Sequence, residues 1–167
     1  MISGGPGWGI DPATLRAVIT DEAAFRARYA DDPALDVLVA LWDGDPDEAM
    51  ARLQPLLDAA PTNWRWRALR ADARRDLGDH VAAIADYRQL ISEHAGTARE
   101  AVLVQHLGKA CFAAEDYPEA AACFERALGL REAGDADSSL VESSRFALER
   151  ANELATQRTR SGPSRGA

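Results

Sequence analysis

The chain has 167 residues, of which 47% are hydrophobic and 28% are charged, and its formal net charge is −8. This composition predicts one soluble folded domain, and no stretch approaches the ~20 apolar residues that a membrane span requires. Two cysteines, Cys111 and Cys123, are too few for a disulfide framework, and no Cys or His spacing is typical of a metal site.

The N-terminus has neither a basic start nor an apolar run, so a cytoplasmic protein is expected. Eighteen arginines against the single Lys109 suggest a GC-rich bacterial genome. Residues 1–10 are glycine-rich and are predicted to be flexible. Residues 11–29 contain two helix starts, Asp11-Pro12 and Thr20-Asp21-Glu22, and predict N-terminal capping helices.

Three stretches further along the chain repeat one pattern. They are GDPDEAMARLQPLLDAAP (44–61), GDHVAAIADYRQLISEH (78–94) and EDYPEAAACFERALGL (115–130). Aligned at spacings of 34 and 37 residues, each has a small residue and, four positions later, a large apolar one. The aligned positions are Ala49, Ala83 and Ala120, followed by Leu53, Tyr87 and Phe124.

Each unit predicts a helical hairpin. An apolar helix runs into a Gly-Asp or Glu-Asp turn, and a second amphipathic helix follows. The small residue lets the two helices approach closely, and the large residue fills the space between hairpins. One hairpin cannot bury its own apolar faces, so the three are expected to stack.

This pattern resembles the tetratricopeptide repeat (TPR) family. The third unit matches the family signature best, at Leu107, Gly108, Tyr117, Ala120, Phe124 and Ala127. The resemblance covers residues 30–134 and implies an all-α, right-handed superhelical array of three TPR-like hairpins. The repeats would span 30–63, 64–97 and 101–134. The resemblance also implies a non-catalytic protein-interaction module or adaptor.

The C-terminal part predicts a cap and a tail. Residues 137–157 contain one amphipathic pattern, which indicates the solvating helix that repeat arrays need at their ends. Residues 158–167 are polar and basic with Gly and Pro, and are predicted to be a disordered tail.

The stretch NWRWRALRADARRDLGDH (63–80) holds two tryptophans and five arginines, a composition that suits nucleic-acid binding. Helical geometry divides these side chains among faces. Trp66 belongs to an apolar ridge that is expected to pack in the core, and Trp64 is not assigned. Arg67, Arg70 and Arg74 share a line where their long stems are expected to lie on apolar surface with the charged heads in water, helped by acids of adjacent helices.

By resemblance to the family, the remaining line of each first helix faces a concave groove. The groove residues predicted to contact a ligand are Arg65, Asp72, Arg75, Gln105, Lys109 and Phe112. Such a lining suits a peptide segment of a protein partner, with apolar anchors and an acidic side chain or a free carboxylate. A groove without a peptide, empty or filled by the chain's own termini, is the other interpretation of these residues.

Two alternative functions come from other classes. One is nucleic-acid or small-anion binding through the arginine-rich helix. This is disfavoured because residues 1–63 carry −7 and residues 98–157 carry −5, so both flanks repel a long polyanion. The other is a self-association scaffold, and the oligomeric state is not predicted.

The sequence indicates no enzyme. His80, His94 and His106 are dispersed, and none has a nucleophile at a motif spacing. The fragment GGPGWG (4–9) follows no strand, so it lacks the context of a phosphate-binding loop. Catalytic residues, cofactors and metal ligands are therefore predicted to be absent.

Overall fold

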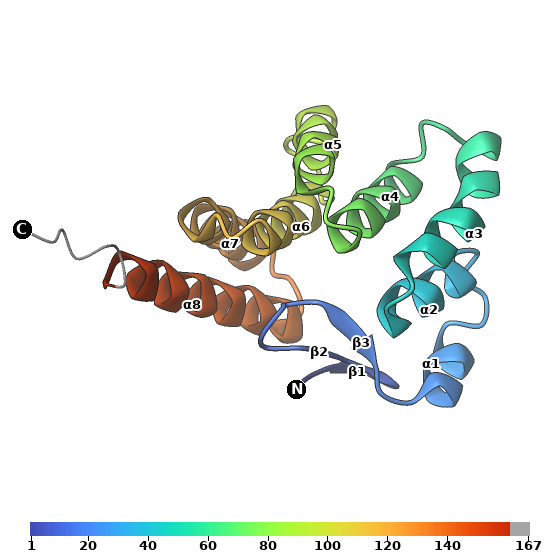
Figure 1. Ribbon diagram of the computed structural model, residues 1–167, viewed down its shortest axis with the longest axis horizontal. Coiled ribbons are helices and arrows are strands. Elements are labelled where there is room, and N and C mark those ends of the chain that lie inside the picture. The colour runs from blue at the N-terminus through green and yellow to red at the C-terminus, as the bar shows by residue number, and fades with distance from the viewer. Residues whose placement is uncertain (161–167) are drawn as a thin grey trace, which may run out of the picture.

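The structure, a computed structural model, describes residues 1–160 (Figure 1). Three strands come first, β1 (Ile2–Gly5), β2 (Trp8–Ile10) and β3 (Ala17–Ile19). Eight helices follow in this described part: α1 (Glu22–Arg28), α2 (Leu35–Asp43), α3 (Pro46–Ala59), α4 (Trp64–Asp76), α5 (His80–Glu93), α6 (Glu100–Ala113), α7 (Tyr117–Ala133) and α8 (Ser138–Arg160). The predicted all-α repeat array is confirmed, with a small sheet added at its start.

The N-terminal segment differs from the prediction. Instead of a flexible start and a first capping helix, it forms an antiparallel sheet of order β1-β2-β3. Glycine permits this arrangement, because a Cβ on Gly9 would lie 2.8 Å from the carbonyl oxygen of Ile2. Asp11, the predicted helix cap, instead accepts bonds from Ala13 N and Thr14 Oγ1 inside the β2–β3 loop. Only the second capping helix exists, as α1.

The helix pairs α2/α3, α4/α5 and α6/α7 are the three predicted hairpins. Their second helices begin in the same way, because Asp45, Asp79 and Asp116 each accept a bond from the backbone N–H three residues later. The turn residue before each of these aspartates is left-handed in all three hairpins, at φ angles of 95°, 85° and 60°. These turn residues are Gly44, Gly78 and Glu115, which the sequence alignment had superposed.

Small and large residues pack within and between the hairpins as predicted. The side chains that recur with the repeat are all fully buried: Ala49, Ala83 and Ala120, and Leu53, Tyr87 and Phe124. Gly108 shows how closely α6 and α7 approach, because a Cβ there would lie 2.6 Å from the Phe124 ring. The array is therefore held by close helix contacts at fixed positions of the repeat.

The core consists of two clusters that meet at α4. Helices α1 to α3 pack against one side of α4, at Trp66, Leu69 and Ala73. The other side of α4, at Ala71, packs with α5 to α8. In Figure 1 the helices curve, and the sheet lies on the inner side of the curve. Trp66 is thus in the core, as predicted.

Helix α8 closes the C-terminal end of the array. Its buried side chains Ser144, Ala147 and Ala151 pack on the preceding helices, which confirms a helix in the predicted place. It ends at Arg160, so three residues of the predicted tail are helical. Arg158 donates to the Glu115 carbonyl oxygen at 2.7 Å and thereby anchors this last turn. The rest of that tail lies outside the described residues.

Candidate functional site

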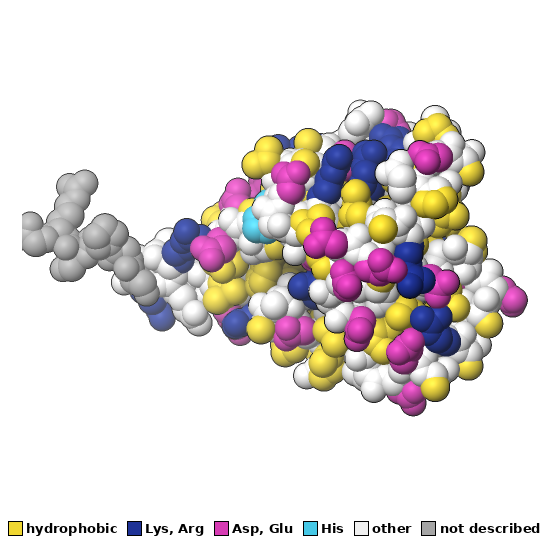
Figure 2. Space-filling model, turned by 45° about the vertical axis from the view of Figure 1, so that its right-hand side comes forward, with side chains coloured by type: hydrophobic (Ala, Val, Ile, Leu, Met, Phe, Trp, Pro, Cys, Tyr) yellow, Lys and Arg dark blue, Asp and Glu magenta, His cyan; other side chains and the backbone are white. Residues whose placement is uncertain are grey.

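The five arginines of residues 63–80 are all paired with carboxylates. Arg65 donates from Nη1 to Asp32 Oδ1 at 2.9 Å, and Arg67 pairs with Glu93. Arg70 and Arg74 both pair with Asp86 of α5, at 3.2 and 2.7 Å. The expectation that acids of a neighbouring helix pair with this line is met. Across the face shown in Figure 2, Lys and Arg side chains lie among Asp and Glu side chains.

An open cavity of about 280 Å³ lies where α1, α2, α4 and α6 come together. We call it the aromatic cavity, because five Phe, Tyr and Trp side chains line it, together with the Asp32–Arg65 pair and seven side chains from the first helices of the hairpins. The aromatic side chains are Phe25, Tyr29, Trp42, Trp64 and Tyr87. The others are Leu38, Ala68, Leu69, Asp72, Val102, Leu103 and His106, the last of which also has an aromatic ring.

Each wall of the aromatic cavity is fixed by packing behind it. Phe25 packs on Trp42 with ring centroids 5.2 Å apart, and Trp8 of β2 stacks on the same indole at 4.9 Å. On the other side, the guanidinium of Arg99 lies 5.2 Å from the centre of the Trp64 ring. The rings are thus held in place before any ligand arrives, which lowers the entropy cost of binding.

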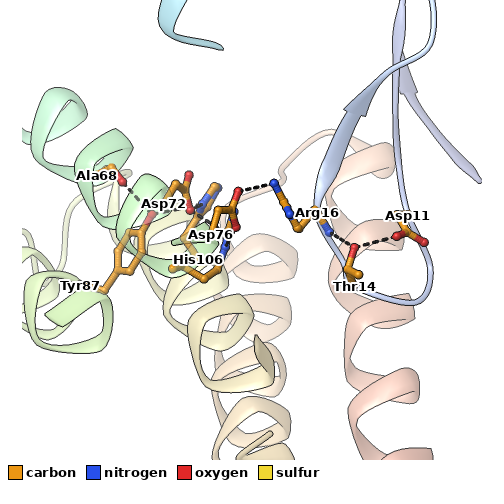
Figure 3. Close-up of polar contacts among 9 residues, drawn as sticks. Asp11, Thr14, Arg16, Ala68, Asp72, Asp76, Tyr87 and His106 are labelled. Carbon is orange, nitrogen blue, oxygen red and sulfur yellow. Dashed lines mark hydrogen bonds and ion pairs between the residues drawn. The ribbon is translucent and has the colours of Figure 1, made fainter. Parts of the chain in front are cut away.

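A chain of polar contacts includes Asp72, Tyr87 and His106, three of the residues that line the aromatic cavity (Figure 3). His106 Nδ1 lies 3.1 Å from Asp72 Oδ1, and Arg75 Nη1 lies 2.7 Å from the same oxygen. Arg75 also donates from Nε to Asp76 Oδ1 at 2.7 Å. Tyr87 donates its hydroxyl proton to the Ala68 carbonyl oxygen at 2.9 Å. This polar network joins α4, α5 and α6.

The network fixes the charges of its members. Burial alone would raise the pKa of the Asp72 carboxyl, but the positive charges of Arg75 and of His106, which is protonated in the acid range where Asp72 titrates, outweigh it and hold the pKa below 3.8. Burial lowers the pKa of His106, and the nearby Asp72 offsets this shift only in part. At neutral pH Asp72 is therefore a carboxylate and His106 a neutral imidazole, and the carboxylate accepts a hydrogen bond from the Nδ1–H group of that ring.

Lys109 of α6 lies near the same network but belongs to no ion pair within residues 1–160. Burial and the positive charge of Arg75 lower the pKa of its ammonium to about 8. Replacing Lys109 by Met is expected to raise the free energy of unfolding at pH 7, by about 3 kcal/mol at most, because a poorly solvated charge is removed.

The stability gained by Lys109→Met should depend on pH. The unfolded chain takes up the Lys109 proton near pH 10.5, whereas the folded chain takes it up near pH 8. The advantage of Lys109→Met should therefore appear as the pH falls from 10.5 to 8 and stay constant below that. Urea unfolding of both proteins at pH 7 and at pH 10.5 measures it. Equal differences at the two pH values would contradict the burial of this charge.

The six predicted groove residues do not form one exposed surface. Arg65 and Asp72 line the aromatic cavity. Arg75 and Phe112 line a second cavity under the β2–β3 loop. Gln105 is 3% exposed and accepts a bond from Ser144 Oγ, because α8 covers it. Lys109 is half-buried beside the network.

Sequence reasoning missed most of the aromatic lining. Phe25 and Tyr29 had been placed in a capping helix, and Trp42 had no assignment. Trp64 was left open although it stands one residue before the groove line of its helix. His106 directly follows Gln105, which was among the predicted groove residues, but only its contact with Asp72 reveals its place.

Within residues 1–160, no three His, Cys, Asp or Glu side chains gather as metal ligands. No helix of the described chain is both long and apolar enough to cross a bilayer.

No protein-family model matches the chain, and no curated protein matches it. Among solved structures, the fold is similar to the crystal structure of the Sgt2 TPR domain from Aspergillus fumigatus, with a TM-score of 0.60 and 19% sequence identity. The match covers 83% of this chain and 86% of that one. This similarity supports a TPR-like fold, which the sequence pattern had predicted.

Proposed function

We propose that this protein is a non-catalytic protein-interaction module that binds a peptide segment of a partner in its concave groove. The observation that carries the proposal is the aromatic cavity, an open and pre-arranged apolar site on the first helices of the repeats. The fold similarity to a TPR domain supports the same class of function. A rigid curved surface leaves most of the ordering cost with the flexible partner.

The lining favours a ligand with a large apolar or aromatic side chain. At about 280 Å³ the cavity is near the small end of ligand sites, which suits a side chain better than a bulky cofactor. The Asp32–Arg65 pair at its edge offers both acceptors and donors to a peptide backbone. An acidic partner residue would bind here only by replacing Asp32 as the partner of Arg65. We therefore expect the apolar side chain of the ligand to contribute more to binding than an acidic one.

A cavity-filling variant tests the proposal. Peptides selected from a random display library on the wild-type chain are expected to carry a large apolar residue and to lose at least about tenfold in affinity for Ala68→Trp. The new indole occupies the space that the peptide anchor needs. Val81→Trp is the matched control, because Val81 is 83% exposed on α5 and lines none of the cavities described above.

Fluorescence anisotropy with the selected peptides measures both variants, and circular dichroism checks that each is folded. Equal affinity for Ala68→Trp and the wild type would overturn the aromatic cavity as the binding site. Loss of binding in Val81→Trp alone would move the interaction to the surface of α5.

A further inference from the structure

The loop between β2 and β3, residues 11–16, occupies part of the groove that the sequence had assigned to a ligand. Leu15 is 1% exposed and joins the core cluster built by α4 to α8. It is the one residue before α4 among the buried members of that cluster within the described chain. An apolar side chain from a loop thus fills a site formed by the helices.

The residue after Leu15 adds a charge contact. Arg16 Nη2 lies 2.9 Å from Asp76 Oδ2, and the Asp76 side chain is only 3% exposed (Figure 3). Asp76 also accepts a hydrogen bond from Arg75, and the same guanidinium donates a second one to Asp72. The groove therefore contains the nearly buried Asp76 carboxylate, and one of its oxygens pairs with the Arg16 side chain of the loop.

Apart from hydrogen bonds within the loop itself, Leu15 and Arg16 are the residues that hold it to the helices. Leu15 has a φ of 57°, a conformation that costs a non-glycine residue energy. Ala13 and Thr14 are exposed. A cavity of about 290 Å³ remains between these loop residues and the side chains of Arg75, Phe112 and Tyr117. A segment with one apolar anchor, one ion pair and a void beneath it belongs to the less stable parts of a structure.

We propose that the site under the β2–β3 loop is a second peptide site, which takes an apolar side chain followed by a basic one from a partner, and that Leu15-Arg16 occupies it in the free protein. A partner cation can replace Arg16 on Asp76, whereas a partner carboxylate would leave Asp76 buried beside a like charge. This goes beyond the proposed function, because the site is separate from the aromatic cavity and prefers the opposite charge to the acidic segment expected from the sequence.

The test adds the loop sequence back as a separate molecule. The probe is a fluorescent peptide DPATLRAV, which copies residues 11–18. It should bind the full-length Leu15→Ser/Arg16→Ser chain at least about tenfold more tightly than the wild type, where the chain's own loop competes at high effective concentration. Peptides DPATSRAV and DPATLEAV should each lose at least about tenfold on the same variant.

Arg16→Ser alone keeps the Leu15 anchor and removes only a part-exposed ion pair, so it remains testable if the double variant does not fold. It should bind the probe more tightly than the wild type and less tightly than the double variant. Equal binding of all folded proteins would overturn the proposal, and so would equal binding of the DPATLEAV peptide. Addition of Ala68→Trp should leave probe binding unchanged, which separates this site from the aromatic cavity.

Discussion

Replacing Asp72 by Ala is expected to lower the free energy of unfolding by about 3–5 kcal/mol. Asp72 is 5% exposed, and its carboxylate contacts both Arg75 and His106. Without it, Arg75 stays buried, and within residues 1–160 Asp76 is its one remaining carboxylate contact. The loss is large because a buried cation is left short of a partner, whereas the pair itself contributes much less.

Urea unfolding at pH 7 measures this loss. The matched control is Asp36→Ala, which removes a carboxylate that is 59% exposed and pairs with Arg26, and it should cost less than about 1 kcal/mol. Because the pKa of Asp72 is lowered on folding, its contribution is present above pH 3.8 and is lost as the pH falls below that value. Equal losses in the two variants would contradict the burial of the network.

Replacing Ala120 by Phe is expected to lower the free energy of unfolding by about 3 kcal/mol. Ala120 is fully buried where α7 meets α6. The approach of these helices is already so close that Gly108 has no room for a Cβ beside Phe124. A phenyl ring at Ala120 must therefore push the two helices apart and weaken the packing of the third hairpin.

Ala122→Phe is the control for this substitution, because Ala122 is exposed on the same helix. It should change the free energy of unfolding by less than about 0.5 kcal/mol. Thermal and urea unfolding of both variants measure the difference. Wild-type stability of Ala120→Phe would show that the small residues of the repeat do not mark the close helix contacts.

The repeat array was predictable because its signal is periodic. Ala83 and Ala120 recur with the hairpin, and burial at those positions follows from packing that every unit shares. The N-terminal sheet carries no such signal. Its strands have three or four residues, and the glycines that suggested flexibility instead allow strands and loop to pack closely, as Gly9 does beside Ile2.

The candidate site was predictable only in part. Helical geometry placed Arg65 and Asp72 on one line of α4, the resemblance to the TPR family implied that this line faces the groove, and both residues line the aromatic cavity. Geometry within one helix could not show which other segments cover that side. Helix α8 buries Gln105, and the β2–β3 loop lies over Phe112. These coverings depend on contacts between distant parts of the chain, which periodicity does not report.

The four tryptophans allow the most direct test of the proposed groove. Trp42 and Trp64 line the aromatic cavity, whereas Trp66 lies in the core between α3 and α4. On addition of a selected apolar peptide to ¹⁵N-labelled protein, the indole N–H resonances of Trp42 and Trp64 should shift and that of Trp66 should not. A shift of the Trp66 resonance without the other two, or binding that moves none of them, would contradict a peptide held in the concave groove.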